Sequence, residues 1–430
     1  MRRGQTARGA ALDMLARYRR SGGEISEPVF SLDDPRENAL ARAIYWGVLQ
    51  NMALLDFHIS CYSTLEAGAM DPALLDVLRT GAYQIEFFDR VPPRAAVYEA
   101  VEEARRRVNR GAASMANAVL RRIAENRDSL PEPGGEEELR LSIKYSHPVW
   151  LCRKLLRLLG DSCEEMLKAD NSPCSLALQA NTLRCGRDEL ARMISQAGTE
   201  CFLHPWEPGT LELPSGTDPL ALEPFTQGLA FVQDPAARAA VSAAGIEPGM
   251  EVLDVCAAPG GKTFAAAMDL SGRGRVMAMD ISEKRLSRVK AGAARLGLGC
   301  VTVRAADARK FDEDLEGTAD AVLADVPCSG LGTIRKKPDI RYKDPARLQT
   351  LPGIQLDILK NVSRYVKPGG VLLYSTCTVL PEENSGVTEA FTEWSGRFEP
   401  EDFTLGAGAV VSKTGRQRCG PMSTDVTASI

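Results

Sequence analysis

Glu251-Val-Leu-Asp-Val-Cys-Ala-Ala-Pro-Gly-Gly-Lys-Thr263 is the stretch that decides the fold. A short apolar strand runs into small residues and glycines, and a helix is predicted to begin at about Thr263. Glycines let a ligand approach the backbone, and a helix N-terminus offers unpaired N–H groups to an anion. The stretch therefore predicts a ligand site at the point where a strand gives way to a helix.

The chain on either side of this turn alternates between strands and helices. Helical patterns such as 283–296 and 355–366 separate short apolar runs. The runs predicted as strands are 252–255, 276–279, 301–303, 321–324 and 371–374. This alternation predicts an α/β domain with a doubly wound parallel sheet, which binds ligands at the carboxyl ends of its strands.

Two common nucleotide sites do not fit the glycine turn. A P-loop needs a glycine five positions before Gly261, where Cys256 stands, and no G-x-G-x-x-G follows the strand. The ligand that remains has a carboxylate and a nucleoside but no pyrophosphate, and S-adenosylmethionine fits that description. Asp280 ends the second strand, where an acid bonds ribose hydroxyls. Asp307 follows the third strand and is a candidate partner of the adenine amino group. The alternative for each acid is a helix N-cap.

Two cysteines follow the fourth and fifth strands. Cys328 lies in Asp325-Val-Pro-Cys-Ser-Gly, and Cys377 lies in Ser375-Thr-Cys-Thr. A buried cysteine is usually an inert small hydrophobe, but both of these are predicted at the ligand edge. A thiolate that adds to C6 of cytosine makes C5 able to accept a methyl group, and Asp325 is a candidate acid near N3. The chemistry alone leaves open which cysteine attacks.

The first part of the chain has no strand-like alternation. Helical spacing is predicted at 7–18, 37–51, 71–88, 95–109 and 112–123, which indicates an all-α bundle. Residues 130–138 are typical of a linker, and a helix is predicted at 149–159. A small α+β module is predicted up to about residue 225. The expected domains are 1–127, 128–225 and 226–430.

Charge is unevenly distributed along the chain. The net charge is −5, from 52 basic and 57 acidic residues, yet residues 1–127 contain eighteen arginines and no lysine. Arginine favours forked contacts to phosphate, so contact with RNA is one interpretation of this cluster. The candidate RNA contacts are Arg105, Arg106, Arg107, Arg121 and Arg335. The alternative is a solvated helix face balanced by Glu102 and Glu103.

The cysteines, the histidines and the apolar runs of the sequence indicate whether a metal site or a membrane segment is expected. The eleven cysteines form no C-x-x-C pair, and the three histidines are far apart, so we expect no metal. No run approaches the roughly 18 apolar residues of a membrane helix. The N-terminal segment has an amphipathic pattern rather than an apolar signal core. The expectation is a cytoplasmic monomer with thiol cysteines and no membrane partner.

Several motifs together carry a family resemblance. Residues 254–263, 325–330 and 375–378 resemble the RNA 5-methylcytosine methyltransferases, most closely the bacterial 16S ribosomal RNA enzymes of the RsmB/Sun type. The stretches 79–85, 95–101 and 117–121 resemble the NusB fold, an RNA-binding module. Further similar segments are 145–150, 179–183, 231–237 and 332–341. The family ends in a strand with Thr-Asp-Gly-Phe-Phe, whereas this chain ends in Ser423-Thr-Asp-Val-Thr-Ala-Ser-Ile430.

The resemblance implies a Rossmann-like catalytic domain, an activity and a role for each motif residue. Cys377 would be the nucleophile, and Cys328 would assist product release. The cofactor-contacting positions would be Cys256, Ala257, Ala258, Pro259, Gly260, Gly261, Lys262, Asp280, Asp307 and Asp325. The implied reaction transfers a methyl group from S-adenosylmethionine to C5 of a cytosine in 16S ribosomal RNA, through a covalent adduct. The alternatives are the same chemistry on transfer RNA and a non-catalytic, antitermination-like RNA-binding scaffold.

Overall fold

The computed structural model divides the chain into two compact units. It describes residues 6–23, 28–401, 409–412 and 416–419. The first unit comprises residues 1–171 together with Lys337–Lys343, and the second comprises the remainder. The N-terminal residues 1–5 and the divergent ending 423–430 lie outside the described residues. None of the described helices is long and apolar enough to span a membrane.

The first unit is helical, as predicted. Its helices are α1 (Ala7–Arg20), α2 (Pro35–Gln50), α3 (Met52–Tyr62), α4 (Pro72–Phe87), α5 (Pro93–Arg107), α6 (Arg110–Glu125), α7 (Glu137–Tyr145), α8 (Val149–Leu159) and α9 (Cys163–Asp170). Local sequence sets several of the starts: Asp34 and Asp71 each cap a helix whose first residue is proline. The core packs fully buried side chains such as Tyr45, Leu78 and Leu120.

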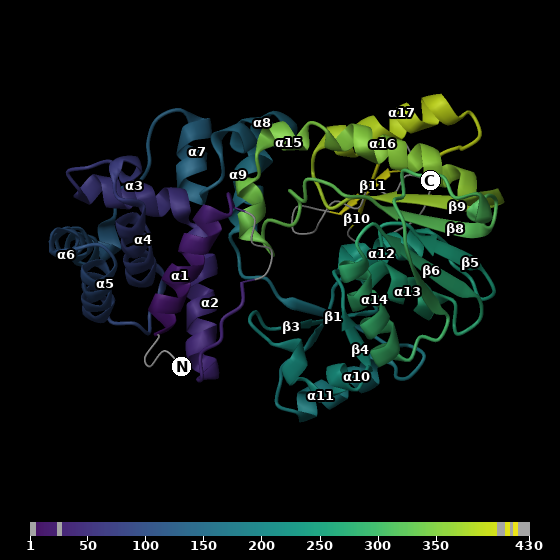
Figure 1. Cartoon of the computed structure of the whole chain (residues 1–430), viewed down its shortest axis with the longest axis horizontal. Helices are drawn as coiled ribbons and strands as arrows, with labels where there is room; N and C mark the ends of the chain where they lie inside the picture. Colours follow the sequence, from purple (N-terminus) through teal and green to yellow (C-terminus); the bar gives the residue numbers. More distant parts are fainter. Residues whose placement is uncertain (1–5, 24–27, 402–408, 413–415, 420–430) are drawn as a thin grey trace. The chain divides into compact units, whose positions relative to one another are not determined.

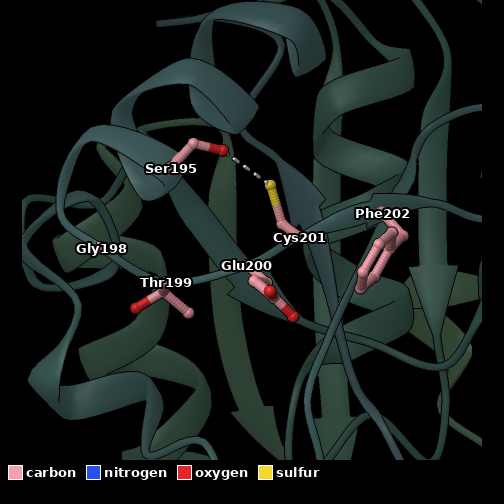
Figure 2. A pocket seen from close by; sticks show the side chains of 6 residues that line it. All are labelled: Ser195, Gly198, Thr199, Glu200, Cys201 and Phe202. Carbon is pink, nitrogen blue, oxygen red and sulfur yellow. Dashed lines mark hydrogen bonds between the residues drawn. The ribbon is translucent and has the colours of Figure 1, made fainter.

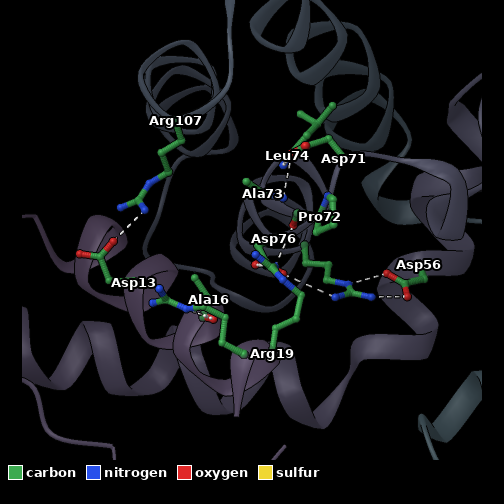
Figure 3. A network of polar contacts seen from close by, with 12 residues as sticks. Asp13, Ala16, Arg19, Asp56, Asp71, Pro72, Ala73, Leu74, Asp76 and Arg107 are labelled. Atoms are coloured by element: carbon green, nitrogen blue, oxygen red, sulfur yellow. Dashed lines mark hydrogen bonds and ion pairs between the residues drawn. The ribbon is translucent and has the colours of Figure 1, made fainter. Parts of the chain in front are cut away.

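A polar network ties α1, α3 and α4 together (Figure 3). Arg79 donates to both carboxylate oxygens of Asp56, at 2.6 and 2.7 Å. Asp76 accepts from Arg19 and lies 3.6 Å from Arg79. Burial raises the pKa of Asp76, against the lowering effect of these two arginines. The network therefore pairs a carboxylate that burial would otherwise penalise.

The segment Lys337–Lys343 belongs to the first unit although it comes much later in the chain. Arg341 is fully buried there. Its guanidinium donates to the carbonyl oxygens of Gln50, Tyr145 and Ser146 and to Oδ1 of Asn171, at 2.9, 3.1, 3.1 and 2.9 Å. The hydroxyl of Tyr342 donates to the Leu49 carbonyl at 2.7 Å. A planar cation with several donors can satisfy several carbonyls at once.

The second unit begins with a small antiparallel sheet of order β2-β3-β1-β4. Its strands are β1 (Leu176–Ala180), β2 (Phe202–Leu203), β3 (Thr210–Leu213) and β4 (Ala230–Val232), with α10 (Arg187–Gln196) and α11 (Glu223–Thr226) between them. Strand β1 pairs with β3 and with β4. The sheet thus reaches past residue 225 and ends directly before the lead-in helix of the larger sheet.

The larger sheet is parallel, with order β7-β6-β5-β8-β9, which confirms the predicted doubly wound α/β fold. Its strands are β5 (Glu251–Asp254), β6 (Arg275–Asp280), β7 (Val301–Ala305), β8 (Ala319–Asp325) and β9 (Val366–Ser375). The helices around it are α12 (Pro235–Ala243), α13 (Gly261–Asp269), α14 (Glu283–Leu296), α15 (Pro345–Leu348), α16 (Leu351–Val362) and α17 (Ser385–Ser395). The antiparallel pair β10 (Ala409–Ser412) and β11 (Arg416–Cys419) follows.

Helices cover both faces of this parallel sheet (Figure 1). Val252 and Leu323 pack in the core with α12, α13 and α14. The adjacent residues Leu253 and Val322 pack on the other face, with α16 and α17. Successive strand residues point to opposite faces, so runs buried on both sides are apolar throughout. The chain order reverses at β5, which places a topological switch point at the carboxyl end of that strand.

Candidate active site

The carboxyl ends of neighbouring strands bring the predicted site residues to one edge of the parallel sheet. Strands β5, β6 and β8 end at Asp254, Asp280 and Asp325, and β9 ends at Ser375, two residues before Cys377. Strand ends in a parallel sheet share one edge. These side chains therefore lie along the edge at which the predicted strands end.

The glycine turn between β5 and α13 needs its glycine. Gly260 has φ +117°, and a Cβ there would lie 2.6 Å from the Phe264 ring. The first helical hydrogen bond joins the Phe264 N–H to the Gly260 carbonyl, so the N–H groups of residues 261–263 have no partner one turn earlier. Asp280 accepts from the N–H of Ala258 at 3.2 Å and fixes the turn to β6. The turn thus presents a helix N-terminus at the switch point.

Lys262 and Asp325 form an ion pair at the sheet edge. Nζ of Lys262 lies 2.8 Å from Oδ2 of Asp325, and the Ser375 hydroxyl donates to Oδ1 at 2.9 Å. Burial lowers the pKa of Lys262, but Asp325, Asp254 and Cys377 together outweigh that effect and the net shift is upward. Lys262 is therefore held as an ammonium ion beside a fixed carboxylate.

The two motif cysteines are in contact. Their Sγ atoms lie 3.1 Å apart, and the N–H of Cys377 donates to Sγ of Cys328 at 3.3 Å. Both are free thiols. The hydrogen bond to Cys377 and then burial raise the pKa of Cys328 well above its ordinary value. Cys328 is thus kept as a neutral thiol in contact with Cys377.

Polar side chains that the sequence analysis did not select brace the two cysteine loops. Glu383 accepts from the N–H of Ser329 at 2.8 Å and from the Gln355 amide at 2.9 Å. Asn384 accepts from Thr376 at 2.5 Å and donates to the Thr378 carbonyl at 2.9 Å. Glu383 and Asn384 stand only a few residues after Cys377, so proximity in sequence was the one available signal.

Lys336 is a second cation near the nucleophile motif. Its side chain is exposed by surface area and forms an ion pair with Asp234. Burial lowers its pKa, against the raising influence of Cys174 and Cys377. The preceding residue, Arg335, is one of the predicted RNA contacts, and it donates to the Pro173 carbonyl at 3.1 Å.

Asp254 is buried at the base of the turn. Its Oδ2 accepts from the Thr263 hydroxyl at 2.7 Å, and its Oδ1 has no hydrogen-bond partner in the described part of the chain. Burial raises the pKa of Asp254 to about 7. This carboxyl is therefore poised to titrate near neutrality.

The other acid and cysteine of the predicted cofactor set lie at the same edge. Asp307 follows β7, and its carboxylate lies 2.8 Å from Arg309. Hydrogen bonds from that arginine lower the pKa of Asp307. Burial raises the pKa of Cys256. Cys256 is therefore a neutral thiol, while Asp307 stays ionised.

The predicted RNA-contacting arginines of α5 are largely paired with acids. Arg105 bonds Glu102, Arg106 bonds Glu103 at 2.6 Å, and Arg107 bonds Glu103 and Asp13 at 2.6 and 2.7 Å. Arg121 is exposed on α6. The positive charge near residues 105–107 is thus partly balanced within the helix face itself.

A separate pocket lies beside the edge strand β2 (Figure 2). It is lined by Ser195, Gly198, Thr199, Glu200, Cys201 and Phe202. Within it, Oγ of Ser195 lies 3.6 Å from Sγ of Cys201, and the N–H of Gly198 donates to the Ser195 carbonyl at 3.0 Å. It contains none of the motif residues. In the ranges that the structure describes, no group of three or more His, Cys, Asp or Glu side chains is arranged to hold a metal ion.

Comparison with known proteins gives three matching family models. A model described as 16S rRNA methyltransferase RsmB/F matches residues 244–425. The NusB family model matches residues 5–125, and a ferredoxin-like domain of RsmF/B-like methyltransferases matches residues 147–218. These spans follow the helical first unit, the small sheet and the parallel sheet in order.

Relatives match over most of the chain. The chain is 34% identical to the probable ribosomal RNA small subunit methyltransferase B of Bacillus subtilis over 375 residues, covering 86% of this chain and 83% of that protein. The solved structure of PH0851 has a TM-score of 0.79 at 24% identity and covers 99% of this chain and 96% of that one. A methyltransferase homolog from Pyrococcus horikoshii has a TM-score of 0.60 at 23% identity, covering 69% of this chain and 98% of that one. The two structural matches establish the fold alone.

Proposed function

We propose that this chain, which belongs to the RsmB/F family of 16S rRNA methyltransferases, methylates C5 of one cytosine in 16S ribosomal RNA with S-adenosylmethionine as the methyl donor. The observation that carries the proposal is the contact between two thiols, 3.1 Å apart, beside the Lys262–Asp325 pair at the sheet edge. An enzyme that methylates an amino group needs no thiol nucleophile, whereas an unactivated pyrimidine carbon does.

The residues at the switch point fit S-adenosylmethionine. Gly260 and Gly261 bring the backbone close to a ligand, and the first turn of α13 offers N–H groups to a carboxylate. Asp280 would bond the ribose hydroxyls and Asp307 the adenine amino group. When bound, the cofactor supplies an electrophilic methyl group. The remaining turn positions, from Cys256 to Lys262, would surround it.

The chain's own residues would perform the covalent chemistry on the base. Sγ of Cys377 would add to C6 of cytosine as the thiol proton passes to N3, whose N–H would then donate to the Asp325 carboxylate, and the addition would leave C5 electron-rich. After C5 has accepted the methyl group, a base removes the C5 proton and the Sγ–C6 bond breaks. Cys328, in contact with Cys377, would assist this release.

The remaining parts of the chain would deliver the RNA. The target base must leave its stack to reach the thiol and the cofactor. We assign residues 1–127 and 128–225 to RNA positioning and residues 226–430 to catalysis, in a monomer that works in the cytoplasm. Arg121 and Arg335 join the α5 arginines as candidate phosphate contacts.

The test is transfer of a tritiated methyl group to 16S ribosomal RNA and, in a parallel reaction, to transfer RNA, both from cells that lack this enzyme, with mapping of the product base. Wild-type protein and a Cys61→Ala control, altered at an exposed cysteine, are expected to label one cytosine. Cys377→Ala is expected to label none. If transfer RNA is labelled instead, the protein carries out the same reaction on transfer RNA. If the protein binds RNA but transfers no methyl group, it is a non-catalytic RNA-binding scaffold.

A further inference from the structure

Gln233 carries a buried side chain that the reaction described so far does not use. It lies between β4 and α12, and its backbone N–H donates to the Ala177 carbonyl at 3.2 Å. Its side chain is 4% exposed, and neither Oε1 nor Nε2 has a hydrogen-bond partner among the described residues. Buried amides are nearly always paired, because an unpaired donor or acceptor keeps its full desolvation cost.

The unpaired carboxamide lies against the glycine turn. Cγ and Nε2 of Gln233 lie 3.7 and 3.8 Å from the point where a Cβ on Gly261 would stand. Gly261 is the first residue of α13, a helix of nine residues whose first-turn N–H groups lie at the switch point. Thus a neutral donor and acceptor adjoin the positive end of a helix dipole.

We propose that Gln233 binds the amino-acid end of S-adenosylmethionine, with Nε2 donating to the α-carboxylate and Oε1 accepting from the α-ammonium. This inference rests on the proposed function and adds a residue to its cofactor site. A zwitterion presents an acceptor and a donor side by side, and a carboxamide is the neutral side chain that presents both. Asp280 ends β6 and Asp307 follows β7. These two acids would bind the nucleoside part of the same cofactor.

Binding of two ligands, one with and one without the amino-acid end, distinguishes contact with that end from a role of Gln233 in packing. S-adenosylhomocysteine carries the amino-acid end, whereas 5′-methylthioadenosine keeps the adenosine and the thioether without it. Binding of both to the full chain is measured by calorimetry for wild type, Gln233→Met and a control, Gln196→Met, which is altered at an exposed position on α10.

The expected result is specific to one ligand and one variant. Gln233→Met should weaken S-adenosylhomocysteine on the order of ten-fold, the scale of one hydrogen bond to a charged group, and leave 5′-methylthioadenosine unchanged. The ligand-free variant should melt at the same temperature as wild type or higher, since it no longer buries an unpaired amide. Gln233→Asn keeps the amide but withdraws it by one methylene, and should give the same selective loss.

Three results would overturn the assignment. Equal weakening of both ligands, or a lower melting temperature without ligand, would make Gln233 a packing residue. Unchanged binding of both ligands with a raised KM for RNA would place the amide on the target base. If wild-type protein bound neither ligand, the cofactor site of the proposed function would itself fail, and this inference with it.

Discussion

Sγ of Cys328 and Sγ of Cys377 lie 3.1 Å apart at the ends of β8 and β9, two neighbouring strands of the parallel sheet. The N–H of Cys377 also donates to Sγ of Cys328. The hydrogen bond to Cys377 and burial raise the pKa of Cys328, so this thiol stays neutral.

The roles proposed for Cys377 as nucleophile and Cys328 in product release predict opposite behaviour of the two alanine variants. Cys328→Ala removes the thiol that assists release, so a covalent protein–RNA adduct should accumulate and appear as a slow band on denaturing gels. Cys377→Ala should give no adduct, because the nucleophile is absent. An adduct formed by Cys377→Ala and not by Cys328→Ala would exchange the two roles.

The raised pKa of Asp254 leads us to expect that the free energy of unfolding depends on pH. Its folded-state pKa of about 7 lies above the ordinary value of 3.8, so the native state retains a proton that the unfolded chain loses. Stability should therefore fall as the pH rises between these two values and level off above the higher one, by at most about 4 kcal/mol. Asp254→Asn should remove this fall, because the amide does not titrate.

Urea unfolding of the ligand-free protein at several pH values measures the effect. The free energy of unfolding of Asp254→Asn, relative to wild type, should increase from about pH 4 to about pH 7. Asp161→Asn, altered at an exposed position, serves as the control and should run parallel to wild type. A constant difference between Asp254→Asn and wild type would refute the raised pKa.

Replacement of the buried Arg341 is expected to lower the free energy of unfolding strongly. Arg341→Met would leave several carbonyl oxygens, including those of Gln50 and Ser146, without this donor. The free energy of unfolding should drop by about 2–3 kcal/mol. Thermal and urea unfolding against Arg36→Met, an exposed arginine of α2, would measure the difference. Equal stability of the two variants would show that water satisfies those carbonyls.

The arginines of the helical unit predict different contributions to RNA affinity. Arg121 is exposed with no ion pair in the part of the chain that the structure describes, whereas Arg106 already bonds Glu103. Arg121→Ala should weaken RNA binding and reduce the dependence of log affinity on log salt by about one unit. Arg106→Ala should do less. If the slope of log affinity against log salt is the same for both variants and wild type, Arg121 of α6 does not contact RNA phosphate.

Much of the parallel sheet was predictable because its signals are local. Five apolar runs became β5 to β9, and the helix predicted at 283–296 is α14 with the same bounds. By contrast, α3 was missed: its residues are apolar on most sides, and only Asn51 separates it from α2. Strand β4 has three residues, too few for any periodicity, and pairing with β1 defines it.

The candidate active site, like the fold, could be predicted only in part. Motif residues such as Cys328 and Cys377 could be placed because strand ends converge on one edge of a parallel sheet. Glu383, Gln355 and Gln233 could not be found, since their importance comes from which groups surround them after folding. Sequence patterns report a residue's own secondary structure and give no information about its tertiary partners.

The interior position of Arg341 has a consequence for how the protein is made. A ribosome that has just released residue 171 has produced helices α1 to α9 of the first unit. The guanidinium that bonds Tyr145 and Asn171 emerges only after β5 to β8 have been translated. The nascent helical unit must wait for a distant stretch of chain before its last interior donors arrive. A gene fragment that stops at Asn171 would encode that unfinished state permanently.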